Sequence, residues 1–196
     1  MIHPDTEVRF INEEKGRGLV ATAFIPKGTV TWTLDPLDRE IHPAELAAYN
    51  EKYQEILLTY SFRNSCGNYI FCWDNGRHIN HSCHNNCCLT PYQLELAVRD
   101  ILPGEELTDD YGYLNIIAPF TPAPEAEGRA TIYPDDLRRH WQKWDGQLAE
   151  AWPLIERVSQ PLRPFTPDKT WLILCSIAEK KRTADSILHC FYPGEE

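Results

Sequence analysis

Two short polar segments concentrate the side chains that could do chemistry. Residues 78–83 read His-Ile-Asn-His-Ser-Cys, which places an amide, an imidazole, a hydroxyl and a thiol on adjacent positions. No helical or strand periodicity of apolar residues runs through them. In residues 106–112, Glu-Leu-Thr-Asp-Asp-Tyr-Gly, Tyr111 stands before Gly112, where a turn can aim its hydroxyl. We therefore interpret both segments as parts of a site.

A glycine pair near the start of the chain forms a third element. Gly16-Arg17-Gly18 leads into the apolar residues 19–24 and then the turn residues 25–28, Ile-Pro-Lys-Gly. On spacing alone these glycines equally suit the closing of a hairpin. They also suit a close approach of the backbone to a ligand, because glycine has no side chain in the way.

In this order, the glycine turn, Asn80-His81-Ser82-Cys83 and Glu106-Leu107-Thr108-x-Asp110-Tyr111-Gly112 resemble the signature motifs of SET-domain protein-lysine methyltransferases. The resemblance covers roughly residues 5–117. It implies a SET (β-clip-like) fold of the α+β class, mainly β, with short curved sheets and a helical C-terminal extension. The expected division is a SET domain at 1–117 and a proline-rich connection with helices at 118–196.

The resemblance also implies an activity, the transfer of a methyl group from S-adenosyl-L-methionine to a lysine of a protein. Tyr111 would be catalytic, with its hydroxyl beside the reacting amine and methyl group. No metal is required. The residues expected to contact the cofactor are Lys15, Gly16, Arg17, Gly18, Asn80, His81 and Tyr111, and those expected to line the substrate channel are Tyr60, Asp109 and Tyr113.

Such a transfer asks mainly for alignment and electrostatics, because the sulfonium already activates the methyl group. The acceptor amine starts near a pKa of ~10.4 and must lose its proton. Desolvation in a narrow aromatic channel and a nearby positive charge both lower that pKa.

Some of these residues have plainer interpretations. An aromatic residue beside an apolar helix, as Tyr60 would be, usually packs in the core, and a lone histidine such as His81 usually serves a buried polar network. The complete motif around His81 favours cofactor contact.

The sequence departs from the family pattern in two places. Family members often place zinc-binding cysteines after the tyrosine motif, but residues 119–129 contain none. A different thiolate site remains open as an alternative, built from Cys66, Cys72, Cys83, Cys87 and Cys88. The second departure is Asp109, where the family usually has an aromatic or small apolar residue. We expect its carboxylate to turn toward the channel mouth or to be held by a donor.

The charge composition of the chain limits the classes of partner that it could bind. The 196 residues carry a net charge of −10, with no cluster of lysine and arginine, which argues against direct nucleic-acid binding. A negative field instead favours a basic, lysine-containing protein segment. No apolar run approaches the ~18 residues of a membrane span. Seven cysteines without a secretion signal predict free thiols in an intracellular, cytoplasmic protein, with the nucleus left open.

The apolar pattern predicts the framework around these motifs. We expect strands at 8–11, 19–24, 29–34, 68–73 and 94–101. We expect helices at 43–60, from 133–136 to 144, and at 168–181 with Asp168 as the cap. The aromatic residues of the first helix should be mostly core. The C-terminal third, which holds eight of the fifteen prolines between 119 and 167, either covers the cofactor or completes the core, and we favour the core.

Two rival functions from other classes remain beside the enzyme. One is a SET fold without turnover that binds a basic peptide, and the other is a zinc-organised binding protein. The substrate protein, the number of methyl groups added and the oligomeric state have no signature in the sequence.

Overall fold

Four small sheets, built from short strands, lie within the first 110 residues of this computed structural model, which describes residues 1–125 and 127–194. Ala126 of the expected connection lies outside the described residues. The strands are β1 (Thr6–Asn12), β2 (Gly16–Ala21), β3 (Val30–Thr33), β4 (Arg39–Ile41), β5 (Ser61–Arg63), β6 (Tyr69–Phe71), β7 (Asn80–His81), β8 (Cys87–Leu89), β9 (Leu94–Ala97) and β10 (Thr108–Asp109).

The strands form two two-stranded and two three-stranded sheets. β1 and β2 form an antiparallel hairpin, and two three-stranded antiparallel sheets have the orders β3-β9-β8 and β4-β6-β5. β7 and β10 pair in parallel. This sheet-rich α+β architecture with a helical C-terminal part confirms the expected fold class.

The β1–β2 hairpin uses its first glycine for the turn. Gly16 has a φ of +70°, a left-handed conformation that residues with a Cβ rarely adopt, and it pairs with Asn12. Gly18 lies inside β2, opposite Arg9. Both glycines therefore belong to the hairpin, and the missing side chain of Gly18 leaves room for Glu106 and Asn80 to approach its backbone.

The expected helix at 43–60 is two helices, α1 (Pro43–Ala48) and α2 (Glu51–Tyr60). They are separate because Asn50 is extended and caps α2, its side chain accepting a 3.1 Å hydrogen bond from the Tyr53 amide. The expectation that the aromatic residues here are core is wrong for α2, which has no buried residue and leaves Tyr53 58% exposed. The reason is that α2 contacts mainly its chain neighbours α1 and β5, and no residue of α2 belongs to either buried cluster.

The C-terminal third completes the core. Its helices are α3 (Asp136–Ala151) and α4 (Asp168–Ala178), joined by 3-10 turns η3 (Trp152–Arg157) and η4 (Arg163–Phe165) and followed by η5 (Ile187–Cys190). Trp144 and Trp152 share one buried cluster with Trp32 and Leu96 of the sheets. α3 thus runs past its expected end at 144, because its last turns pack on β8 and β9.

The last helix differs from expectation at both ends. Pro167 occupies the cap position of α4 and Asp168 lies in its first turn, where its charge favours the helix dipole without a capping hydrogen bond. α4 ends at Ala178 rather than 181.

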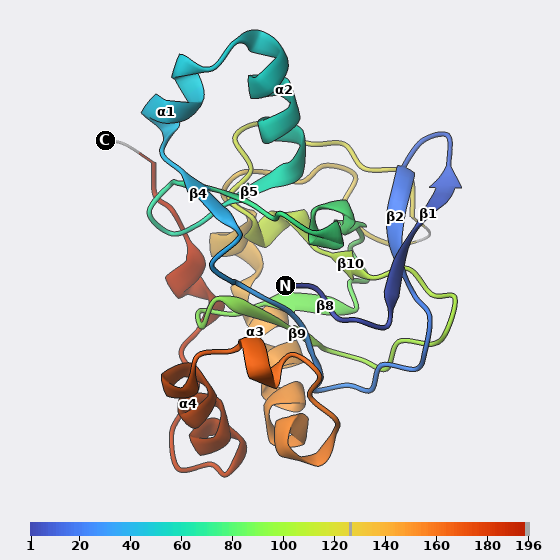
Figure 1. Cartoon of the computed structure of the whole chain (residues 1–196), viewed down its shortest axis with the longest axis vertical. Helices are drawn as coiled ribbons and strands as arrows, with labels where there is room; N and C mark the ends of the chain where they lie inside the picture. The colour runs from blue at the N-terminus through green and yellow to red at the C-terminus, as the bar shows by residue number, and fades with distance from the viewer. Residues whose placement is uncertain (126, 195–196) are drawn as a thin grey trace.

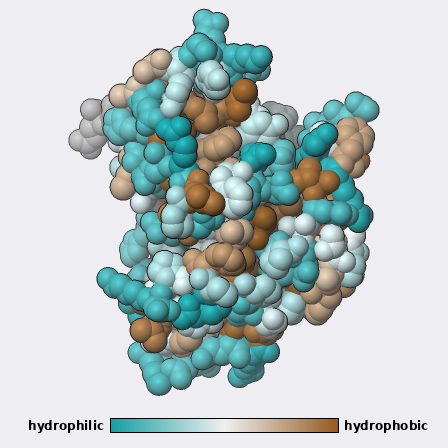
Figure 2. All heavy atoms as spheres, viewed as in Figure 1, coloured by the Kyte–Doolittle hydropathy of each residue, from teal (hydrophilic) through white to brown (hydrophobic). Residues whose placement is uncertain are grey.

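The elements are arranged along the long axis of the molecule, with α1 and α2 at one end, α3 and α4 at the other, and the sheets between them (Figure 1). Figure 2 shows separate apolar patches among hydrophilic side chains, including some close to the α1–α2 end. Among the described residues, no helix is both long and apolar enough to cross a bilayer.

Candidate active site

The parallel pairing of β7 with β10 brings the two polar segments together. Asn80 lies opposite Thr108, and His81 lies opposite Asp109. Immediately after β10 the chain turns into the 3-10 helix η2 (Tyr111–Tyr113), and the Tyr111 amide donates a 3.0 Å hydrogen bond to His81 Nδ1. One motif therefore holds the backbone of the other at Tyr111.

His81 acts in this contact as a neutral acceptor. Burial lowers the pKa of His81, and this effect outweighs the opposing charges of Asp110 and Glu125. With Nδ1 accepting from the amide, the ring proton belongs on Nε2, which lies 3.5 Å from Cys83 Sγ. In this structure the His81 ring therefore takes part in a buried polar network, through contacts with the Tyr111 amide and the Cys83 thiol.

Asn80 joins the second motif to the glycine hairpin. Its Nδ2 donates to the Arg17 carbonyl at 3.0 Å and to Glu106 Oε1 at 2.7 Å. Glu106 Oε2 lies 3.1 Å from the ammonium of Lys15. A Cβ on Gly18 would come 2.3 Å from Glu106 Oε1, so only glycine lets this network close.

Tyr111 is fixed at its hydroxyl as well as at its amide. The hydroxyl donates a 2.9 Å hydrogen bond to the Ile79 carbonyl, and the ring packs against His81 and Phe120 with centroid distances of 5.4 and 5.6 Å. Burial raises the pKa of Tyr111 above its usual value, and the charges of Asp109 and Glu106 raise it further. The hydroxyl is therefore neutral and held in place at physiological pH.

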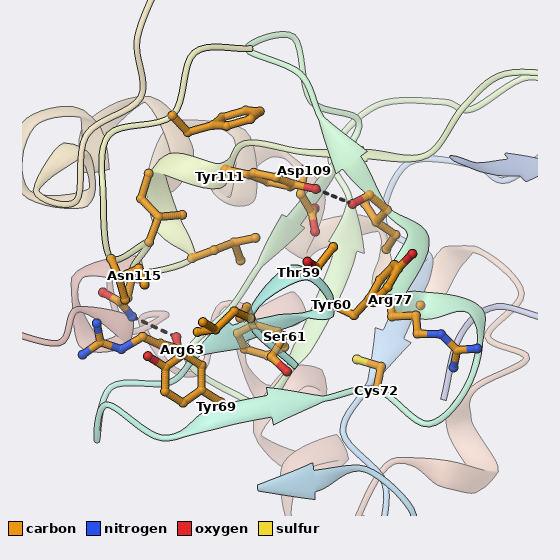
Figure 3. Close-up of a pocket in the computed structure, with 18 of the residues that line it drawn as sticks. Thr59, Tyr60, Ser61, Arg63, Tyr69, Cys72, Arg77, Asp109, Tyr111 and Asn115 are labelled. Carbon is orange, nitrogen blue, oxygen red and sulfur yellow. Dashed lines mark hydrogen bonds between the residues drawn. The ribbon is translucent and has the colours of Figure 1, made fainter. Parts of the chain in front are cut away.

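A cavity of about 410 Å³ opens beside Tyr111. One wall is the end of α2 with β5, including Tyr60, and another is the segment 114–120. Figure 3 shows Asp109 and Tyr111 projecting into the cavity from one side, with Thr59 and Tyr60 across from them. The cavity therefore contains the candidate catalytic tyrosine together with two of the three predicted channel residues.

Tyr113, the third predicted channel residue, lies behind the cavity wall. It is fully buried, stacks edge-on against Trp144, and its hydroxyl donates to Asp109 Oδ1 at 2.8 Å. The same hydroxyl accepts from the Asp110 amide at 3.0 Å. The turn of η2 explains this placement, since it directs Tyr111 and Tyr113 to different sides.

Asp109 is held by a donor but does not reach the mouth of the channel. It is 3% exposed, and a second buried acid, Glu95 of β9, lines the same cavity. Burial raises the pKa of Asp109 to about 6, although the hydrogen bonds from Tyr113 and Glu95 lower it. Burial and the Asp109 charge raise the pKa of Glu95 well above its usual value, so Glu95 holds the proton between them.

Glu95 was missed by the sequence interpretation. Its signal was an acid in the middle of an otherwise apolar strand, Leu94–Ala97. Its cross-strand partner is Trp32, which also lines the cavity.

Asp110, beside Tyr111, ties the motif to the C-terminal third. Its buried carboxylate pairs with the Arg129 guanidinium and with the Lys143 ammonium, and it accepts from Trp144 Nε1 at 3.3 Å. It also caps η2 by accepting from the Gly112 amide at 3.1 Å. Two cations and one indole N–H from residues 129–144 thus pair with the carboxylate next to the candidate catalytic tyrosine.

The cysteines do not gather around a common point. Cys87 and Cys88 are fully buried in separate apolar clusters, while Cys66 is exposed. Within residues 1–125 and 127–194, no three His, Cys, Asp or Glu side chains lie close enough to hold a metal ion.

Comparisons with known proteins agree with this site. The family model described as SET domain matches residues 16–112, the span that begins at the glycine turn and ends just past Tyr111. The chain belongs to the SET-domain family.

Two curated relatives are both named histone-lysine N-methyltransferase SETMAR. The mouse protein is 29% identical over 128 residues and the rat protein 31% over 134 residues, in each case across 56% of this chain. The match covers 41% of the length of either relative. These relatives support a lysine methyltransferase type of family.

Proposed function

We propose that this protein is a protein-lysine N-methyltransferase that uses S-adenosyl-L-methionine as methyl donor. The observation that carries the proposal is the neutral Tyr111 hydroxyl, which is fixed by His81 and Ile79 and faces the cavity of a SET domain. A neutral hydroxyl can orient an amine and a methyl group without adding a competing charge.

The residues on the hairpin side suit the cofactor chemically. Its amino-acid end carries one carboxylate and one ammonium, and the half-buried pair Lys15–Glu106 offers the matching opposite charges, with the Asn80 amide beside it. No atom lies within 4 Å of a Cβ built on Gly16, so the turn is open on that side. When bound, the cofactor supplies a methyl group made electrophilic by its sulfonium.

The cavity suits the acceptor. Tyr60, Phe62 and Tyr111 supply aromatic surface that removes water from an entering aliphatic side chain. Desolvation lowers the pKa of a lysine amine and thus favours its reactive neutral form. With a net charge of −10, the protein would favour a basic segment of the substrate protein.

A label-transfer assay tests this proposal. Purified protein is incubated with cofactor carrying a labelled methyl group and with cell lysate, and the labelled sites are read by mass spectrometry. We expect label on lysine side chains of one or a few proteins. Label on no lysine, from protein shown to bind the cofactor, would contradict the proposal.

Asp109 favours a second candidate, a SET-fold module that binds a basic peptide without turnover. A buried carboxylate near the acceptor stabilises the ammonium form and so opposes transfer. Binding of basic peptides without label transfer would support this candidate.

A further inference from the structure

The floor of the cavity is acidic, although its walls are largely aromatic and aliphatic. Glu95 and Asp109 both line the cavity, at 4% and 3% exposure, and the interaction between the two carboxyls shifts the pKa of each. They come from different sheets, β9 and β10, so the pair exists only because these elements meet at the cavity.

The pair holds one proton and one negative charge at neutral pH. Two buried carboxyl groups in contact do not both ionise, and the pKa directions assign the proton to Glu95 and the charge to Asp109. The titratable and charged groups around the pair are the hydroxyls of Tyr111 and Tyr113, the thiols of Cys72, Cys87 and Cys88, the carboxylate of Asp110 and the amino group of Met1.

The protein leaves one hydrogen-bond acceptor of the pair without a donor. Tyr113 occupies Asp109 Oδ1, but Glu95 Oε2 is buried and has no hydrogen-bond partner. Trp32 Nε1, from the residue paired with Glu95 across the sheet, is also buried without a partner. Buried polar atoms without partners are costly. Glu95 Oε2 can accept a hydrogen bond from a ligand that carries a donor, whereas Trp32 Nε1 is itself a donor and needs an acceptor.

We propose that Glu95 and Asp109 form a binding subsite for the ammonium head of the acceptor side chain. This inference rests on the proposed function, because it assigns the amine-recognising groups of the same cavity. The subsite carries one negative charge for one positive charge and leaves aromatic walls for the aliphatic stem.

The geometry favours a primary ammonium over a guanidinium. A guanidinium binds best as a planar fork to both oxygens of one carboxylate. Asp109 cannot offer both oxygens, since Tyr113 holds Oδ1. An ammonium has three donors that diverge, so it can contact Glu95 Oε2 and the Asp109 carboxylate without needing a planar arrangement of acceptors.

A purely structural role for the pair makes a different prediction. If the shared proton only fastened β9 to β10, substitutions would alter stability and would change the binding of charged and neutral ligands alike. Ligand charge therefore separates the two roles.

The experiment titrates the purified, cofactor-free chain with three probes by NMR at pH 8. The probes are the N-acetyl, N-methylamide derivatives of lysine, norleucine and arginine. We expect the lysine probe to bind about tenfold more tightly than norleucine, which shares its stem, and more tightly than arginine. Equal affinity for lysine and norleucine would overturn the proposal, and equal affinity for lysine and arginine would overturn the assignment to a primary ammonium.

Variants then locate the preference. Asp109→Asn and Glu95→Gln should each reduce the lysine-over-norleucine preference to within about threefold, while Glu55→Gln should retain it. Glu55 is exposed on α2, is not one of the cavity-lining residues, and controls for the loss of one negative charge. Retention of the full preference in both cavity variants, with folding verified by their amide spectra, would overturn the subsite.

Because no methyl transfer is involved, failure here is distinct from failure of the proposed function. A labelled lysine product without probe discrimination would reject only the subsite. Probe discrimination without label transfer would reject only the enzyme activity. Lowering the pH below 6 should also weaken the preference, since protonating Asp109 removes the charge.

Discussion

The Tyr113 hydroxyl donates a 2.8 Å hydrogen bond to the buried Asp109 carboxylate, from the side opposite the cavity. The tyrosine expected to line the channel therefore supports its floor. Through this bond η2 positions both Tyr111 and Asp109, which line the cavity, because Tyr111 and Tyr113 are its first and last residues.

Tyr111→Phe should reduce methyl transfer about 10²–10³-fold, the usual loss when one donor that acts in the transition state is removed. Affinity for the demethylated cofactor product should change less than threefold, since the His81–Tyr111 backbone bond remains. Single-turnover kinetics and calorimetry measure the two quantities. Unchanged turnover in the variant would remove the hydroxyl from the mechanism.

Gly18→Ala should weaken cofactor binding at least tenfold while the protein still folds. The new methyl group would displace Glu106, whose Oε1 lies 2.3 Å from the added Cβ position, and thereby disturb its bonds to Lys15 and Asn80. Gly146→Ala is the control, because no atom lies within 4 Å of its added Cβ. Calorimetric titration with cofactor compares them, and equal affinities would separate this network from the cofactor site.

Asp109→Asn should make the protein more stable at pH 8, by about 1–3 kcal/mol, because a buried carboxylate loses its charge. Burial raises the folded pKa of Asp109 to about 6, so its proton is bound more tightly in the folded state. The stability it contributes in acid is lost as the pH rises from about 4 through 6, and the variant lacks this change. Urea unfolding at pH 5 and pH 8 measures it, and a variant less stable than wild type at pH 8 would contradict the burial argument.

Arg129→Gln should destabilise the protein by about 1.5–3 kcal/mol, the range for a hydrogen bond to a charged group. Asp110 would remain fully buried with only Lys143 and Trp144 as side-chain donors from the C-terminal third. Arg139→Gln is the matched control. Its ion pair with Asp135 is exposed and should contribute less than about 1 kcal/mol. Equal unfolding free energies for the two variants would show that the Arg129 bond is not needed.

The sequence by itself determined the order of the motifs and the family. Asn80, His81 and Tyr111 can be recognised because each lies in a short motif of neighbouring residues. Those neighbours, such as Gly112 after Tyr111, are the residue types that the local backbone conformation needs. It also predicted the strands β1, β2, β3, β6 and β9, since short apolar runs bounded by turn residues specify local structure, but not β4, β5, β7, β8 or β10. These signals are local, so they survive without knowledge of the fold.

Tertiary structure alone decided what surrounds Tyr111. The alternation of side chains along a strand distinguishes two faces but does not show which face lines a cavity. From the sequence, Glu95 is only an acid in an otherwise apolar strand, and its place in the cavity beside Asp109 is visible only in the fold. The same holds for Asp110, whose partners Arg129 and Lys143 come from a region without any motif. It holds too for the aromatics of α2, a helix that joins neither buried cluster. Burial and pKa depend on contacts between distant segments, and those contacts exist only in the folded chain.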